Sequence, residues 1–152
     1  MRLRAEIRHL QHKLGVTTVR VTHDQEEALS VADFVGKINV LPGRLQPGRS
    51  VPIGQMHFAC ELEADAARDV KVYLRPEDLL ARPIAPGDPN VFQADIEKIE
   101  FLGSYCHVSV RSAEIGPQSL TVYLSLNYLA EQGLAVGSRL PLRVMPERMR
   151  FF

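Results

Sequence analysis

Proline and glycine recur every few residues between positions 42 and 54, at Pro42, Gly43, Pro47, Gly48, Pro52 and Gly54. Proline and glycine at such short spacing break helices and are typical of turns between short strands. From there to the C-terminus, β-type runs alternate with turn residues, at 56–62, 70–75, 91–101, 105–111, 119–125 and 139–144. Many short strands separated by turns predict a mainly β fold, either a small barrel or a sandwich.

The same part of the chain carries three further local signals. The segment VFQADIEKIEFLG at 91–103 nearly alternates apolar and polar residues, so one face of that strand should pack inward. Gly103-Ser104 has the character of a hairpin turn. Residues 126–132 have the composition of a short helix that ends at Gly133.

The first 33 residues have a different character. Apolar residues follow helical spacing at Leu3, Ile7, Leu10 and Leu14. Gly15 is well placed to end that helix, and the β-branched run VTTVRV at 16–21 predicts a short buried strand. The following QEEALSVAD predicts a second helix, so this segment is a piece of an α/β domain. We therefore divide the chain into residues 1–36 and 37–152.

Charge and cysteine usage limit the classes of partner. Lys plus Arg and Asp plus Glu both number 18, so the net charge gives no general reason to expect nucleic acid or an anionic membrane. The N-terminus has no signal-peptide core, and no apolar run is long enough to span a bilayer. We therefore expect a cytoplasmic protein without membrane insertion. Cys60 and Cys106 lie in apolar strand-like stretches and should be reduced core residues, and no Cys/His spacing is typical of a metal site.

The aromatic side chains are scattered over strand positions, at Tyr73, Phe92, Phe101, Tyr105 and Tyr123. They are not interleaved with basic residues, whereas a barrel that binds single-stranded nucleic acid combines stacking with positive charge. We therefore expect no nucleic acid partner. His107 should lie on the solvent face of a strand and is not expected to be a ligand.

The string VTTVRVTHDQEEALSVAD at 16–33 closely resembles the switch region of ABC ATPases, where a strand ends in a histidine that reaches the γ-phosphate of ATP. The resemblance implies that His23 is this switch histidine. An imidazole can donate a hydrogen bond to a phosphoryl oxygen as negative charge develops on it. An isolated histidine after a strand would be a surface or capping residue, so it is the whole string that favours the catalytic interpretation.

The other parts of an ABC ATPase site are missing from these 152 residues. They contain no phosphate loop of the form GxxxxGK[ST], no LSGGQ signature and no acidic strand to hold Mg²⁺ and polarise water. One histidine supplies only part of the stabilisation that phosphoryl transfer requires. We therefore expect this chain alone to bind no cofactor and to be inactive as an ATPase, whereas the resemblance implies ATP and Mg²⁺ for the intact subunit.

The junction between the two parts departs from the family pattern. In relatives, the helix EEALxxAD leads into two more strands, a helix and a stretch that ends in something like FVADFVG. Here Ala32-Asp33 is followed directly by Phe34-Val35-Gly36. The tripeptide VAD therefore matches both the end of the family's EEALxxAD helix and the start of its later VADFVG stretch. We infer that the family's segment between these two similar sequences is absent from this chain. The alternative is a naturally short variant.

The motif VYLRPEDLLAR at 72–82 is the most specific feature of the second part. Together with GKINVLPGR, IEKIEFLGSYCHVSV and GLAVGSRLPLRVMPERMRFF, it resembles the TOBE domain of importer ATPases, a small OB-like β-barrel. Pro76 should end a strand, and Glu77 and Asp78 can cap the next turn and pair with Arg75. These residues form either a structural corner or a ligand contact, since TOBE domains mediate subunit contacts and in some branches sense small ligands.

These resemblances cover nearly the whole chain. They identify it as a C-terminal fragment of the ATP-binding subunit of a bacterial ABC importer, with a short α-β-α remnant of the ATPase domain in 1–36 and a TOBE-type regulatory domain in 37–152. The strings FLGSYCHVSV, LSLN and LPLRVMPERMRFF look most like the phosphonate branch, which includes 2-aminoethylphosphonate importers.

The resemblance also implies partners and a location. The expected partners are permease subunits and a second ATP-binding subunit, with a homodimer of this chain and a position peripheral to the inner membrane on its cytoplasmic side. Two alternatives from other classes are a free-standing OB module that binds a small ligand and carries a vestigial arm, and an inert remnant without a function of its own.

Overall fold

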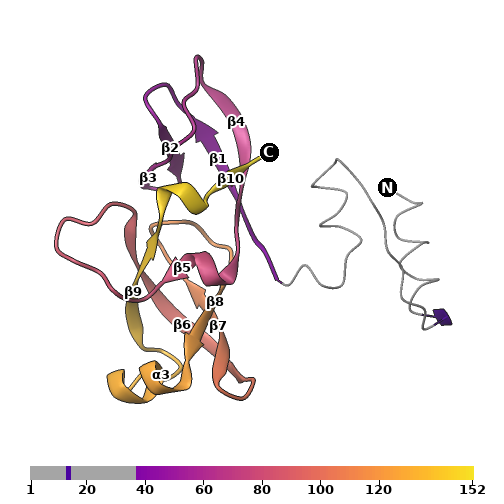
Figure 1. The fold of residues 1–152 in the computed structure, drawn as a ribbon, viewed down its shortest axis with the longest axis vertical. Helices are drawn as coiled ribbons and strands as arrows, with labels where there is room; N and C mark the ends of the chain where they lie inside the picture. The colour runs from indigo at the N-terminus through magenta and orange to yellow at the C-terminus, as the bar shows by residue number, and fades with distance from the viewer. Residues whose placement is uncertain (1–12, 15–36) are drawn as a thin grey trace. The chain divides into compact units, whose positions relative to one another are not determined.

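The computed structural model describes residues 13–14 and 37–152, and the coloured ribbon of Figure 1 follows them. The chain divides into two units between Gly36 and Lys37. Lys13 and Leu14 are helical. The rest of the helix, strand and helix predicted for the first 33 residues, including His23, lies outside the described residues.

The larger sheet of the second unit has five antiparallel strands. In spatial order they are β5 (Leu79–Leu80), β9 (Arg139–Val144), β6 (Val91–Phe101), β7 (Tyr105–Arg111) and β8 (Leu120–Ser125). The long strand β6 pairs with β9 along its first half and with β7 along its second half. Its register with β7 shifts between Ile96 and Lys98, and such a bulge bends a strand and increases its twist. The sheet therefore curls into a nearly closed, barrel-like surface (Figure 1).

Two smaller sheets complete this unit. One has the order β1 (Asn39–Leu45), β4 (Arg68–Leu74) and β10 (Arg150–Phe151), and the other pairs β2 (Ser50–Ile53) with β3 (Met56–Ala59). Both are drawn at the upper end of this unit in Figure 1. The expectation of a mainly β, OB-like barrel is confirmed.

Strands β1 and β2 correct the view that residues 42–54 serve mainly as turns. Pro42 lies within β1 and Pro52 within β2. Both strands are at sheet edges, where the missing N–H of proline needs no partner. Gly43 allows β2 to pack closely on β1, because a Cβ at this position would come within 2.8 Å of Val51 Cγ2.

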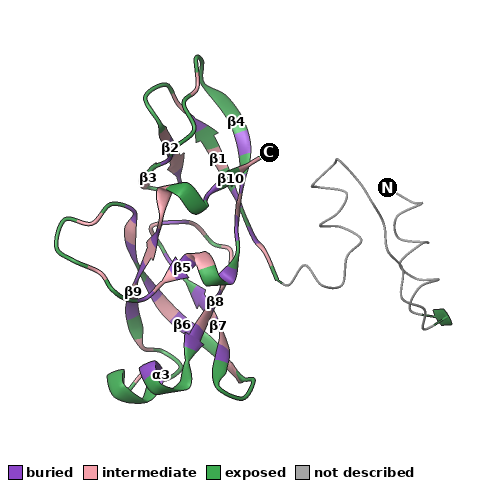
Figure 2. Cartoon of the chain, viewed as in Figure 1, coloured by how far each residue is buried: buried purple, intermediate pink, exposed green. Residues whose placement is uncertain are grey.

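Side chains that alternate along the strands fill one continuous hydrophobic core (Figure 2). In β6 the inward residues are Phe92, Ala94 and Ile96, as the pattern at 91–103 predicted. The ring of Phe92 meets that of Phe58 in β3 edge to face, with centroids 6.1 Å apart. This contact joins the larger sheet to the two-stranded one.

Both cysteines belong to this core. Cys60 and Cys106 are buried free thiols, which confirms the prediction of core residues without a disulfide. Burial raises the pKa of both thiols. Because the thiolate is the reactive form, neither side chain is a candidate nucleophile.

Two buried asparagines join the sheets to one another. Asn39 donates from Nδ2 to Thr121 O at 2.8 Å and accepts at Oδ1 from Thr121 N at 2.7 Å. Asn90 makes the same pair of hydrogen bonds with Ala59 of β3, at 2.8 Å and 2.7 Å, and its Nδ2 also donates to Val144 O at 3.1 Å. Each amide therefore bonds to a backbone N–H and C=O as a neighbouring strand would. Separating the smaller sheets from the larger one would break these hydrogen bonds.

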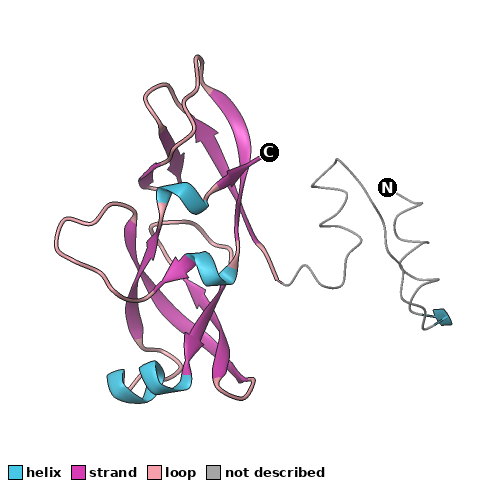
Figure 3. Cartoon of the chain, viewed as in Figure 1, coloured by secondary structure: helices cyan, strands magenta, loops and turns pink. Residues whose placement is uncertain are grey.

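The helix predicted at 126–132 is confirmed as α3 (Leu126–Gln132; Figure 3). Ser125 Oγ accepts a hydrogen bond from Tyr128 N at 3.1 Å, which caps the first turn. Gly133 ends the helix in the left-handed region, with a φ of 60°. The Gly103-Ser104 turn between β6 and β7 is also present as predicted.

Two short 3₁₀ turns complete the helical elements, η1 (Pro76–Asp78) and η2 (Pro146–Arg148). η1 follows β4, and η2 lies between β9 and β10. Within the described part of the chain, no helix is long and apolar enough to cross a membrane.

Candidate functional site

The RPED element forms a corner between β4 and β5. β4 ends at Leu74, and Pro76 opens η1 and is buried. The backbone N–H of Arg75 donates to Asp78 Oδ2 at 3.1 Å, and the N–H of Asp78 donates back to Arg75 O at 2.9 Å. The carboxylate of Asp78 therefore stabilises the turn by a hydrogen bond within it, as expected for a structural corner.

The other two charged residues of the element are more exposed. Arg75 Nη1 lies 4.0 Å from Glu77 Oε1, and their side chains are 65% and 53% exposed. An exposed pair at this distance contributes little to stability, so both groups can rotate to meet another partner. A ligand contact by Arg75, Glu77 or Asp78 stays a prediction.

An open groove of about 210 Å³ lies beside η1, and of the three predicted residues only Glu77 lines it. The other walls come from residues 79–82, residues 123–125 and Tyr128. The guanidinium of Arg82 lies 4.8 Å above the ring of Tyr128, and its Nη1 is 3.0 Å from Glu131 Oε2. These two contacts hold the Arg82 side chain in place at the rim of the groove.

Three aromatic rings form a compact cluster on β7 and β8, which the sequence interpretation of scattered aromatics missed. His107 and Tyr123 are paired across the two strands, and their rings stack in parallel with centroids 4.4 Å apart. Tyr105 lies 5.6 Å from Tyr123 and 5.8 Å from His107. The signal in the sequence is the spacing of two between Tyr105 and His107, which puts both on one face of a strand.

Burial raises the pKa of Tyr123, and the carboxylate of Glu77 and the hydroxyl of Tyr105 raise it further, so the Tyr123 hydroxyl stays protonated.

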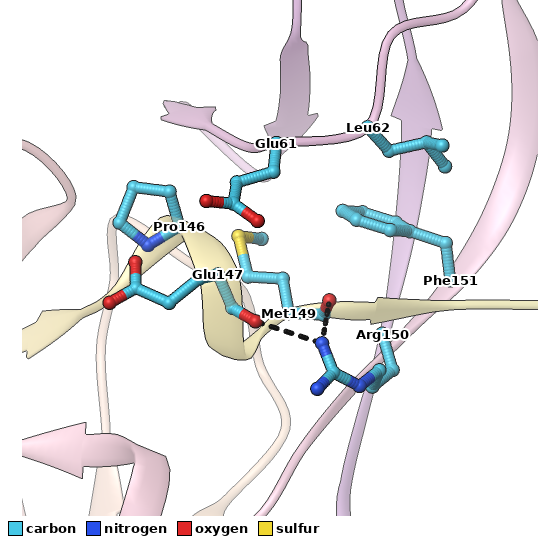
Figure 4. A pocket seen from close by; sticks show the side chains of 7 residues that line it. All are labelled: Glu61, Leu62, Pro146, Glu147, Met149, Arg150 and Phe151. Atoms are coloured by element: carbon cyan, nitrogen blue, oxygen red, sulfur yellow. Dashed lines mark hydrogen bonds between the residues drawn. The ribbon is translucent and has the colours of Figure 1, made fainter.

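A second pocket, of about 350 Å³, lies between the segment after β3 and the end of the chain (Figure 4). We call it the C-terminal pocket. It is lined by Glu61, Leu62, Pro146, Glu147, Met149, Arg150 and Phe151. No residue that the sequence analysis proposed for a site lies in it. Among the residues that the structure describes, no group of three His, Cys, Asp or Glu side chains could hold a metal ion.

Comparison with known proteins gives one family match. Residues 72–152 match the TOBE domain family, and this segment starts within β4 and includes the RPED corner, the five-stranded sheet, α3 and β10. Among solved structures, the cytoplasmic molybdate-binding protein ModG, crystallised with molybdate bound, has a similar fold. The TM-score is 0.57 with 15% sequence identity, over 74% of this chain and 94% of ModG.

Curated relatives align along nearly the whole chain. The Fe(3+) ions import ATP-binding protein FbpC 2 of Rhizobium meliloti is 29% identical, over 99% of this chain and 48% of the relative. The sulfate/thiosulfate import ATP-binding protein CysA 2 of Chromobacterium violaceum is 28% identical, over 99% of this chain and 50% of the relative. The chain thus spans about half the length of these relatives. Because the TOBE match covers more than half of the chain and coincides with the observed barrel, this chain belongs to the TOBE domain family.

Proposed function

We propose that this chain carries the regulatory domain of the ATP-binding subunit of an ABC importer. The observation that carries the proposal is the TOBE-family barrel in a chain that aligns, over 99% of its length, with importer ATP-binding proteins. That alignment extends into the first 36 residues, where the sequence resembles the ABC switch region. A free-standing ligand-binding module is not favoured, because it would not account for this segment.

The proposed arrangement assigns residues 1–36 to the ATPase domain and residues 37–152 to the regulatory domain. The alignment with FbpC 2 runs over 191 positions, whereas the chain has 152 residues, so at least 39 positions (191 − 152) have no counterpart here. This difference supports the absence of an internal segment, which we place at the VAD tripeptide that ends in Ala32-Asp33.

The proposed partners are permease subunits and a second ATP-binding subunit, at the cytoplasmic face of the membrane. The two relatives are named for Fe(3+) and for sulfate or thiosulfate, and neither is named for a phosphonate. The comparisons thus give the phosphonate branch no support. In such importers the binding protein and permease select the solute, so the regulatory domain is a weak guide to it.

A domain exchange tests the proposal. Residues 37–152 would replace the matching C-terminal region of CysA 2, and sulfate uptake would be measured in cells that lack that subunit. We expect the chimera to restore uptake above the level of a CysA 2 variant without this region. A chimera that accumulates to normal levels yet gives no more uptake than the deletion would contradict the proposal.

The isolated chain should not bind MgATP with micromolar affinity. Without a phosphate loop, no set of backbone N–H groups cradles the phosphates, and His23 alone cannot replace them. Isothermal calorimetry of the full chain against MgATP, with intact FbpC 2 as the positive control, measures this. A micromolar dissociation constant for the chain would mean that its nucleotide site does not depend on the missing motifs.

A further inference from the structure

The charges of the C-terminal pocket are unevenly distributed. Its one basic lining residue, Arg150, is committed to the backbone, because Nη1 donates to Glu147 O at 2.8 Å and to Met149 O at 3.3 Å. In Figure 4 the guanidinium lies away from the carboxylates of Glu61 and Glu147. Within residues 37–152, neither carboxylate is engaged by a side-chain hydrogen bond or an ion pair. Among the described residues, the pocket thus presents two solvent-exposed carboxylates that no cationic side chain contacts.

The neighbouring acidic side chain is different in this respect. Glu63, two residues after Glu61, lies 3.3 Å from the guanidinium of Arg49 and does not line the pocket. The absence of a partner is thus a property of Glu61 and Glu147, and is not shared by the whole acidic segment.

The rest of the pocket is apolar. Leu62, at 39% exposure, and the half-buried ring of Phe151 supply most of the accessible apolar surface, and Met149, at 3% exposure, lines the pocket beside them. A volume of about 350 Å³ lies at the small end of the range for small-molecule sites. An alkyl chain could cover this surface and remove it from water, which is favourable in proportion to the area buried.

We propose that the C-terminal pocket binds a small linear organic cation, an alkyl chain that ends in an ammonium group. The carboxylates of Glu61 and Glu147 accept hydrogen bonds from the ammonium, and Met149, Leu62 and Phe151 contact the alkyl chain. An anion is repelled by both carboxylates, and a neutral alkyl chain gains no attraction from these exposed charges. The proposal does not depend on the transport role of the chain.

A matched series of probes tests the ligand class. The full chain, labelled at the methionine methyl groups, would be titrated with n-pentylammonium, n-pentanol and pentanoate, and the NMR signal of Met149 followed. We expect saturable shifts with the ammonium at millimolar concentration, weakened by added salt, and no saturation with the alcohol or the carboxylate. Equal binding of the alcohol, or no shift of Met149 with the ammonium, would overturn the proposal.

Variants then test the two carboxylates. Glu61→Gln and Glu147→Gln should each weaken binding of n-pentylammonium by about fivefold, because each removes one charged acceptor. Glu63→Gln makes the same change of charge in the same segment but outside the pocket, and should alter the affinity by less than about twofold. If Glu63→Gln weakens binding as much as Glu61→Gln does, the attraction is a general effect of net charge and the pocket is not the site.

Discussion

Replacing Asn90 by alanine should lower the free energy of unfolding by about 4 kcal/mol. The side chain is 6% exposed and makes three hydrogen bonds, to Ala59 N, Ala59 O and Val144 O. Removing it leaves the part-buried N–H and C=O of Ala59 in β3 and the buried C=O of Val144 in β9 with fewer partners, at roughly 1–3 kcal/mol for each buried group left unsatisfied. Alanine is also disfavoured at the φ of 60° that Asn90 adopts.

Two further variants separate these causes. Asn90→Gly removes the amide but tolerates a positive φ, so it should still lose most of the stability if the hydrogen bonds dominate. Asn127→Ala, at an exposed position in α3, should change stability by less than about 0.5 kcal/mol. Urea unfolding followed by circular dichroism gives all three values. A loss below about 1 kcal/mol for Asn90→Ala would mean that the amide does not hold the sheets together.

Replacing Gly54 by alanine should cost about 3 kcal/mol, through a steric conflict and a strained backbone. Gly54 forms the turn between β2 and β3 with a φ of 60°. A Cβ there would overlap the carbonyl oxygens of Glu114 and Ile115, and these belong to a backbone that cannot move as a flexible side chain can. Glu114 O is also the acceptor for Gln55 N at 2.8 Å, so the two loops are held in contact.

Gly48 offers the matched control for this variant. It also has a positive φ, of 87°, but nothing lies within 4 Å of a Cβ added there. Gly48→Ala should therefore cost only the backbone term, about 1 kcal/mol. If the two variants lower the urea midpoint equally, the contact between the turn at Gly54 and the loop at Glu114 and Ile115 contributes nothing to stability.

The chimera of CysA 2 that tests transport should also lose sulfate uptake when it carries Gly54→Ala.

The strands that the sequence predicted best are those with local support. The bounds predicted for 91–101, 105–111 and 139–144 agree with β6, β7 and β9, because each run alternates and is flanked by turn residues. α3 was predictable for a similar reason, since Ser125 and Gly133 mark its ends within the sequence. The RPED corner is equally local, because Arg75 and Asp78 bond to each other three residues apart.

Strands β1 and β2 could not be predicted in this way. Their prolines and glycines favour turns locally. β1 is a strand because it pairs with β4, further along the chain, and β2 because it pairs with β3, the strand that follows it. The cluster of Tyr105, His107 and Tyr123 was missed because it depends on strand pairing. Tyr123 meets His107 only because β7 and β8 pair in one register, and a shift by one residue would place the rings on opposite faces.

By itself, then, the sequence determined the mainly β character of residues 37–152 and most strand positions. It also determined the RPED corner and the resemblance to TOBE domains. All of these depend on residues that are close together in the chain. The tertiary structure alone decided how the sheets are joined and where the pockets lie. Asn39 and Thr121 are 82 residues apart in sequence, and the C-terminal pocket combines Glu61 with Glu147. Contacts over such separations depend on which strands pair and in which register, and that choice is made by the burial of the whole core and not by any local pattern.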